Sequence, residues 1–347
     1  MGTERRQLEG DRPADTLAGS SDDRPVITQA GLRALGHESD STAVALRKAD
    51  EGQGGCRRRA NIHAVTEHGS TRIDPFLGTV VHVVASRQAR PNLPSTGCPF
   101  CVGGLEAPDP YEVRSFPNRW PALGEGRCEV VLYTPEHDAT FASIGEAGAR
   151  RVIDLWAERT AALRAAGAEY VLVFENRGAE VGATISHPHG QIYAYDHVPH
   201  RPHRLLTAGW RPEADPGDRL VLADRAWRVW TQDASVHPIS LSVAPEMELP
   251  DLVAADDDQR DRLAATLVDL FGRLDRFYDR PLPYMMWLHQ APTSWDGDTS
   301  PWFNIEIVSP WRSAGVPRFI AAAETACEEY FNPVDPADVA ARLRGLT

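Results

Sequence analysis

At 347 residues the chain is long enough to bury a sizeable core, either as one large domain or as two. Its formal net charge of -13 disfavours nucleic acid as a partner, although a few local arginines can still bind a nucleotide. Five cysteines, an odd number, do not fit the disulfide framework of a secreted protein, and no apolar run is long enough to span a bilayer. We therefore expect a cytoplasmic protein without a membrane partner.

Residues 1–61 form the first distinct segment of the chain. They are rich in Asp, Glu, Arg, Gly and Ser and contain few large apolar side chains. Such a composition cannot bury enough apolar surface to fold alone, so we expect a disordered or loosely attached extension and assign no function to it.

From Thr71 onward the composition changes to that of a folded domain. A turn at residues 74–75 precedes a β-branched strand that we expect over residues 79–84. Arg87 and Arg90 follow this strand. Two arginines at this spacing either solvate a loop or bind phosphate, for which the planar guanidinium group is well suited.

Cys98 and Cys101 are separated by two residues. Such a pair has three interpretations, which are a redox pair, half of a zinc site, and a coincidence. A redox pair requires a thioredoxin-like βαβ context, which the surrounding sequence does not show. A zinc site requires two further ligands from elsewhere in the chain.

The next predicted elements are a helix and a strand. We expect a helix over residues 146–167, because Val152, Trp156 and Leu163 fall on one face of it. A buried strand over residues 170–174 follows. The loop after this strand contains glycines, which let backbone N–H groups approach an anion.

The segment Ser186–Tyr193 is the motif around which the chain is organised. If it is extended, His187, His189 and Gln191 project from one side. A neutral imidazole is a nucleophile and a metal ligand, and a glutamine amide can donate to an anionic oxygen. The row therefore suits attack on a phosphate. The alternative is a turn in which the histidines bond only the local backbone.

The second half of the chain repeats the order of elements in the first. We expect an amphipathic helix over residues 258–279, followed by strands over 284–288 and 302–308. Helix, strand, loop and strand thus occur twice, roughly 110 residues apart, which indicates duplicated halves. A last helix is expected over residues 336–344.

The central motif and the segments on both sides of it, from about residue 70 to 345, resemble the histidine-triad superfamily, in particular its galactose-1-phosphate uridylyltransferase branch. Hydrolases of that superfamily carry a third histidine where this chain has Gln191, and the transferases carry Gln there. The resemblance implies that His189 is the nucleophile and that Gln191 holds a phosphate oxygen.

The resemblance also implies a structural zinc ion, with His137 and His187 completing the ligand set begun by Cys98 and Cys101. Two thiolates and two imidazoles suit tetrahedral zinc without an open position. Finally, the resemblance implies contacts to the phosphates, the nucleotide and the sugar from a further set of residues: Arg87, Arg90, Asn118, Asn176, Gly182, Thr184, Glu324 and Tyr330.

The chain departs from the family pattern at two places. Tyr330 stands near the position of a Gln that contacts the sugar in the galactose enzymes, so the identity of the sugar stays open. Asn304 and Glu306 stand where relatives have His-x-His or His-x-Glu, while His289 is kept. Some relatives bind a second metal ion here, and these changes argue against one in this chain.

The expected fold is α+β, with two histidine-triad-like halves whose antiparallel sheets form an extended half-barrel with flanking helices. Residues 62–203 are expected to carry the zinc site and the catalytic motif. Residues 204–347 are expected to be a degenerate repeat that contributes to the sugar site.

The resemblance implies a UDP-glucose:hexose-1-phosphate uridylyltransferase of galactose metabolism. It would work by a ping-pong mechanism through a covalent nucleotidyl-histidine, with a nucleoside diphosphate sugar and a sugar 1-phosphate as substrates. Relatives are homodimers, so the resemblance implies a homodimer.

Several alternatives stay open. One is an adenylyltransferase similar to ADP-glucose phosphorylase, with inorganic phosphate as the acceptor, and another is a specialised sugar-1-phosphate nucleotidyltransferase. A zinc-stabilised protein that binds nucleotides without turnover is the non-enzyme alternative. A nucleotide hydrolase ranks third, because Gln191 replaces the third histidine.

Overall fold

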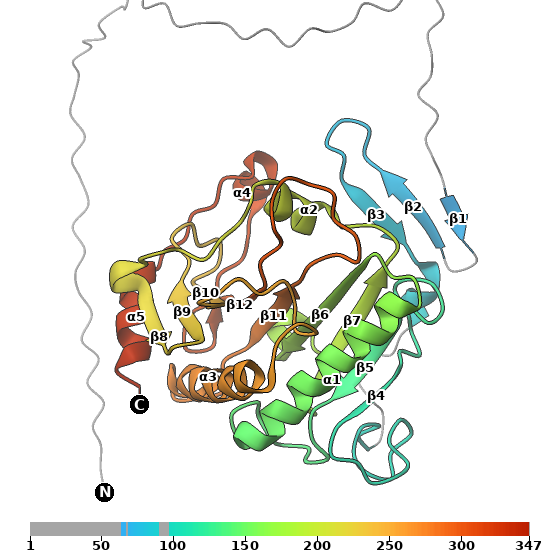
Figure 1. Cartoon of the computed structure of the whole chain (residues 1–347), viewed down its shortest axis with the longest axis horizontal. Coiled ribbons are helices and arrows are strands. Elements are labelled where there is room, and N and C mark those ends of the chain that lie inside the picture. The colour runs from blue at the N-terminus through green and yellow to red at the C-terminus, as the bar shows by residue number, and fades with distance from the viewer. Residues whose placement is uncertain (1–63, 67–68, 90–96, 347) are drawn as a thin grey trace, which may run out of the picture. The chain divides into compact units, whose positions relative to one another are not determined.

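The computed structural model describes residues 64–66, 69–89 and 97–346, which belong to one compact unit spanning Arg59–Thr347 (Figure 1). The predicted extension over residues 1–61 and the predicted phosphate ligand Arg90 lie outside the described residues. Among the described helices, none is both long and apolar enough to cross a membrane.

The fold is built on a nine-stranded sheet in which every pair of neighbours is antiparallel. The strand order is β4-β5-β7-β6-β11-β12-β10-β9-β8, so the sheet is open, with β4 and β8 at its edges. This architecture confirms the predicted α+β class. The strands are β4 (Arg114–Pro117), β5 (Cys128–Leu132), β6 (Tyr170–Arg177), β7 (His189–Tyr195), β8 (Leu220–Ala223), β9 (Trp227–Thr231), β10 (Ile239–Pro245), β11 (Tyr284–His289) and β12 (Asn304–Ser309).

Two long helices, α1 (Gly145–Ala165) and α3 (Asp257–Arg276), lie side by side against one face of this sheet (Figure 1). Their apolar residues and the inward-facing strand residues form one continuous core. A capping box between Asp256 and Gln259 starts α3. The helix ends at Arg276, three residues before the predicted end at Asp279. Asp279 has a left-handed backbone conformation with φ 54°, which is incompatible with an α-helix.

Shorter elements complete the described part of the chain. A separate antiparallel sheet precedes the large one, and the predicted strand over 79–84 is its third strand. The helix predicted over residues 336–344 is present. These elements are β1 (Ala64–Thr66), β2 (Gly69–Ile73), β3 (Val80–Val83), η1 (Ala85–Ala89), η2 (Ala179–Val181), α2 (His200–Thr207), η3 (Gly217–Arg219), β13 (Trp311–Ser313), β14 (Val316–Pro317), α4 (Ala322–Cys327) and α5 (Pro336–Arg344).

The order of helix and strands repeats along the sheet. The order α1, β6, β7 recurs as α3, β11, β12, and β6 pairs with β11. The register places Phe174 opposite Trp287, with Gln191 beyond Phe174 and Glu306 beyond Trp287. One row of side chains therefore crosses these four strands on the face opposite α1 and α3 and continues beyond Gln191 to Val130 and beyond Glu306 to Ser242.

Candidate functional site

Strand β7 presents the central motif. Its residues alternate between half-buried and buried, which places His189 and Gln191 on one face and Gly190 on the core face, as predicted. The strand begins at His189 rather than at Ser186, because Pro188 has no N–H to contribute to a ladder. The rings of His187 and His189 nevertheless both pack against Phe100, so the two histidines point to the same side.

A backbone carbonyl orients the ring of His189. Nδ1 of His189 lies 2.7 Å from the carbonyl oxygen of His187. A carbonyl can only accept, so this contact puts the ring proton on Nδ1 and the lone pair on Nε2. The sequence motif shows a histidine, whereas the structure shows which of its two ring nitrogens carries the lone pair.

The four predicted metal ligands come together. One ligand atom from each of Cys98, Cys101, His137 and His187 lies within 4.8 Å of all the others. Nδ1 of His187 is 3.7 Å from Sγ of Cys98 and 3.6 Å from Sγ of Cys101, and Nδ1 of His137 is 3.5 Å from Sγ of Cys101. Zn–S and Zn–N bonds at a tetrahedral angle separate sulfur from nitrogen by about 3.6 Å. The residues fit zinc.

The surroundings of these residues fit the protonation states that a metal requires. The carbonyl of Thr134 is 2.8 Å from Nε2 of His187, which leaves Nδ1 as the ligand atom. Burial lowers the pKa of His187 and so favours its neutral ring. Burial and the adjacent Cys98 raise the pKa of Cys101, so two thiolates at this place need a cation between them.

Several predicted substrate residues surround this motif. Asn176 lines one cleft with Ser186, His187 and His189. The cleft lies at the end of β6. This strand continues to Arg177, three residues beyond the predicted end, because it pairs with β11.

Two further predicted contacts lie along the same face of β7. Asn118 Nδ2 donates to Gln191 Oε1 at 3.3 Å, and Arg87 Nη1 donates to the Tyr193 hydroxyl at 3.3 Å. Since Tyr193 follows Gln191 by two residues, Arg87 and Asn118 both approach the face that carries His189.

Other predicted substrate residues lie elsewhere. Gly182 ends η2 with φ 86°, a conformation that favours glycine, and Thr184 follows it in the loop before Ser186. Glu324 and Tyr330 are not among the described residues that line the cleft at His189. Tyr330 lines a different, open groove.

The Glu324 carboxylate is already engaged within its own loop. It accepts from the backbone N–H groups of Ala321 at 3.0 Å and Phe331 at 2.9 Å, and it forms an ion pair with Arg318. Glu324 therefore holds the α4 segment together, whatever else it contacts.

Comparison with known proteins agrees with this geometry. A family model described as galactose-1-phosphate uridyl transferase, N-terminal domain, matches residues 118–199. The galactose-1-phosphate uridylyltransferase of Streptomyces lividans is 34% identical over 305 residues, covering 79% of this chain and 86% of the relative. The chain belongs to the galactose-1-phosphate uridylyltransferase family. The enzyme of the same name from Thermotoga maritima is 30% identical over 309 residues, with 79% and 97% covered.

Solved structures of similar proteins superpose on this chain. A structure titled uridylyltransferase superposes with a TM-score of 0.71 at 26% identity, covering 80% of this chain and 97% of the other. An ADP-glucose phosphorylase from Arabidopsis thaliana, solved with bound ADP-glucose, superposes with a TM-score of 0.62 at 22% identity, covering 80% and 99%. At that identity the second likeness shows the fold alone.

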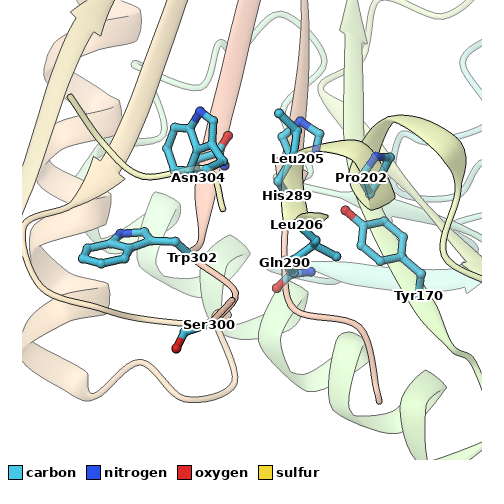
Figure 2. A pocket seen from close by; sticks show the side chains of 10 residues that line it. Tyr170, Pro202, Leu205, Leu206, His289, Gln290, Ser300, Trp302 and Asn304 are labelled. Carbon is cyan, nitrogen blue, oxygen red and sulfur yellow. The ribbon is translucent and has the colours of Figure 1, made fainter. Parts of the chain in front are cut away.

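A polar cluster surrounds His289, which also lines the pocket drawn in Figure 2. Nε2 of His289 is 2.8 Å from Glu306 Oε1, and Arg201 Nη2 donates to Glu306 Oε2 at 2.6 Å. Burial alone would raise the pKa of Glu306, but the hydrogen bond from His289 and the charges of His289 and Arg201 lower it to about 2.

These residues do not fit a divalent cation. Arg201 already brings a positive charge to Glu306 and stacks over Trp287 at 5.4 Å. Asn304 lines the adjacent pocket beside His289 (Figure 2) and supplies no imidazole. In the described part of the chain, the cluster around Cys98 is the one group of three or more His, Cys, Asp or Glu residues that could hold a metal.

Some contacts of the site have no signal in the sequence. Tyr111 and Thr134 touch His187, and Ser186 Oγ lies 3.2 Å from Nε2 of His137. Thr134 acts through its backbone carbonyl, which any residue would supply. A tyrosine 76 positions before His187 carries no mark of this contact in the sequence.

Proposed function

We propose that this chain is a nucleotidyltransferase that exchanges a uridylyl group between UDP-glucose and a hexose 1-phosphate. Curated relatives at 34% and 30% identity carry the name galactose-1-phosphate uridylyltransferase, which supports the assignment. The observation that carries the mechanism is the 2.7 Å contact between His189 Nδ1 and the His187 carbonyl, since it leaves Nε2 as the attacking atom.

The reaction takes two displacements at the α-phosphorus. Nε2 of His189 attacks this atom and forms an N–P bond, while the P–O bond to the departing sugar 1-phosphate breaks. The leaving phosphate keeps the bonding electron pair and is a good leaving group, so it needs little help from a proton donor. A phosphate oxygen of the second hexose 1-phosphate then attacks the same phosphorus and releases the histidine.

Gln191 and Asn118 fit a role in holding the non-bridging oxygens. Because Asn118 donates to the Gln191 side-chain oxygen, the amide nitrogen of Gln191 is the group that can donate to a phosphate oxygen. An amide cannot deliver a proton as an imidazolium does, which suits transfer to a second phosphate. We retain Arg87, Arg90, Asn176, Gly182 and Thr184 as proposed phosphate contacts.

We propose that Cys98, Cys101, His137 and His187 hold a zinc ion. Zinc with four protein ligands has no open position, so its contribution is to fix the chain segments that bind it. His187 then serves twice, because its ring faces the two thiols and its carbonyl orients His189. The thiols must stay reduced to bind, which supports a cytoplasmic location.

We further propose that the enzyme is a homodimer and that residues 62–203 and 204–347 act as its catalytic half and its sugar-binding half. Glu324 and Tyr330 do not line the cleft of their own chain within the described residues. Their proposed contact with the sugar lies outside this cleft, and the proposed homodimer rests on the family resemblance.

Intact-mass measurement tests the function directly. The purified protein is incubated with UDP-glucose or with ADP-glucose, and peptide mapping locates any adduct. We expect one uridylyl group on His189 and an equal amount of released glucose 1-phosphate. An adenylyl group from ADP-glucose alone would favour the phosphorylase-like alternative. No adduct from either donor would contradict the covalent mechanism.

A further inference from the structure

The hydroxyl of Tyr111 joins three segments that bear metal ligands. It lies 2.7 Å from the carbonyl oxygen of Phe100, 2.9 Å from that of Thr134 and 3.1 Å from Nε2 of His187. Phe100 lies between the two cysteines, Thr134 stands three residues before His137, and His187 is itself a ligand. One side chain therefore reaches every part of the proposed zinc site.

The protons at this junction can be assigned. Nδ1 of His187 faces the two sulfurs, so its ring proton is on Nε2 and points toward the Thr134 carbonyl and the Tyr111 oxygen. The hydroxyl proton of Tyr111 then goes to the Phe100 carbonyl, its shortest contact. Tyr111 thus donates to the cysteine loop, and the imidazole N–H is shared between the Thr134 carbonyl at 2.8 Å and the Tyr111 oxygen at 3.1 Å.

We propose that Tyr111 is a positioning residue for the zinc ion, acting through His187 and through the loop between Cys98 and Cys101. This inference rests on the zinc site proposed above. Removing the hydroxyl leaves all four ligand atoms in place, but the Phe100 carbonyl loses its donor and the His187 ring loses one of its two acceptors. The ligands are then held less firmly, and the metal leaves faster.

The competing interpretation is that Tyr111 only fills space beside the cysteine loop, with a hydroxyl satisfied by whichever carbonyl is near. That interpretation predicts a general loss of stability on removal of the hydroxyl, without a specific effect on the metal. The two interpretations therefore differ in what the variant changes. A positioning role predicts faster zinc release with little change in melting temperature, and a space-filling role predicts a lower melting temperature without a specific change in zinc release.

The test compares Tyr111→Phe with Tyr278→Phe. Tyr278 is a matched control, because its part-buried hydroxyl donates to a backbone carbonyl, that of Trp311, at 3.4 Å. Zinc-loaded wild-type protein and both variants are mixed with an excess of a chromogenic chelator. We expect Tyr111→Phe to release zinc about tenfold faster or more than the wild type. Its melting temperature in the zinc-loaded form should stay close to that of Tyr278→Phe.

Each outcome decides something. If Tyr111→Phe releases zinc at the wild-type rate, the inference on Tyr111 is overturned while the zinc site stands. If wild-type protein holds no zinc, both fail. If Tyr111→Phe is unfolded even in excess zinc, the residue has a general structural role and the inference is wrong. If it folds only in excess zinc, the zinc release rate of that loaded form decides, because zinc stabilises any folded form that binds it; release at the wild-type rate overturns the inference and faster release supports it.

Nucleotidyl transfer is measured separately on the same samples. A wild-type protein that holds zinc but forms no nucleotidyl adduct would contradict the proposed function without touching Tyr111. Cobalt-loaded protein gives a further reading, because its ligand-field absorption reports the geometry of the ligands. We expect Tyr111→Phe to shift that spectrum and Tyr278→Phe to leave it unchanged.

Discussion

His189 can be tested against another histidine of the same chain. We expect His189→Ala to lower transfer by at least about 10³-fold and to abolish the nucleotidyl adduct, because the proposed N–P bond forms at Nε2 of this residue. The matched control is His197→Ala, whose ring is half-exposed and pairs with Asp196. An adduct that persists in His189→Ala would place the nucleophile elsewhere.

Gly190 is required by the packing behind β7. A Cβ at this position would lie 2.2 Å from the Tyr133 hydroxyl and 3.1 Å from the carbonyl oxygen of Phe174. We expect Gly190→Ala to lower the free energy of unfolding by about 1–3 kcal/mol, measured by denaturant titration. Adding Tyr133→Phe removes the nearest atom and should recover part of that loss. If the two losses simply add, the clash is not the cause.

For single residues, the sequence predicts which side chains form the candidate site better than it predicts the main-chain groups that hydrogen-bond to them. The spacing of Cys98 and Cys101 and the motif of His187 and His189 stand out in the sequence. The structure brings the two cysteines together with His137 and His187, which the family resemblance implied. The His187 carbonyl that orients His189 is a main-chain group, and its direction depends on the fold. No residue pattern carries that information.

On strand β6, Glu175 is a carboxylate buried in the core beside Tyr133 and Tyr284. Burial raises its pKa to about 7 from 4.5, against the lowering effects of the Tyr284 hydroxyl, the Arg177 charge and the Tyr133 hydroxyl; the nearby Asp275 adds to the increase. Between pH 4.5 and 7 the unfolded chain loses this proton while the folded chain keeps it. The free energy of unfolding therefore falls as pH rises through this window, and levels off above it.

Glu175→Gln should remove this pH dependence. The amide stays neutral, so we expect the variant to gain stability relative to the wild type between pH 5 and pH 8, by up to about 3 kcal/mol. Denaturant unfolding at the two pH values measures the difference. Glu180→Gln, at an exposed position in η2, is the control and should show no such gain. Equal slopes for Glu175→Gln and wild type would show that Glu175 ionises normally.

Helix α2 is attached to the sheet through Arg201. Its partner Glu306 has a side chain only 7% exposed, so removing the guanidinium leaves a buried carboxylate with one cation fewer. Because Arg201 itself is 63% exposed, we expect Arg201→Ala to cost about 1–2 kcal/mol rather than the full penalty of a buried pair. Arg225→Ala breaks an ion pair exposed on both sides and is the control. Equal losses for the two variants in denaturant unfolding would contradict this role.

Element boundaries show where prediction from sequence ends. The apolar spacing predicted α1 and α3, because core-facing residues repeat at the helical period. Strand β6 continues to Arg177 because β11, more than 100 residues later, pairs with it. The partner strand is set by the tertiary fold and cannot be predicted from the local sequence.

For the molecule as a whole, zinc removal is the informative perturbation. The proposed ligands come from three separate segments, so a chelator should both lower the melting temperature and stop formation of the nucleotidyl adduct. Adding zinc back should restore both. His189→Ala should keep its zinc while lacking the adduct, which separates metal binding from chemistry. A stripped protein that still forms the adduct at the wild-type rate would show that zinc does not support the nucleophile.

The predicted order of helix, strand and strand recurs in the structure, and the α+β class is confirmed, while the division into two halves stays a prediction. The same reasoning could not locate Glu324 and Tyr330 relative to His189. Both come after the last strand of the large sheet, where no periodic pattern fixes the path of the chain. Their place in the sugar site stays a prediction.

The double use of His187 has a consequence for the living cell. In the proposed mechanism its imidazole binds the metal and its carbonyl orients the neighbouring catalytic ring, so zinc occupancy and reactivity are linked through a single amino acid. When zinc is scarce, or when oxidants modify the two thiols, a fraction of the protein molecules would lose the metal and become inactive. The total rate of the reaction would then fall because fewer molecules are active, while each active molecule keeps its normal turnover rate.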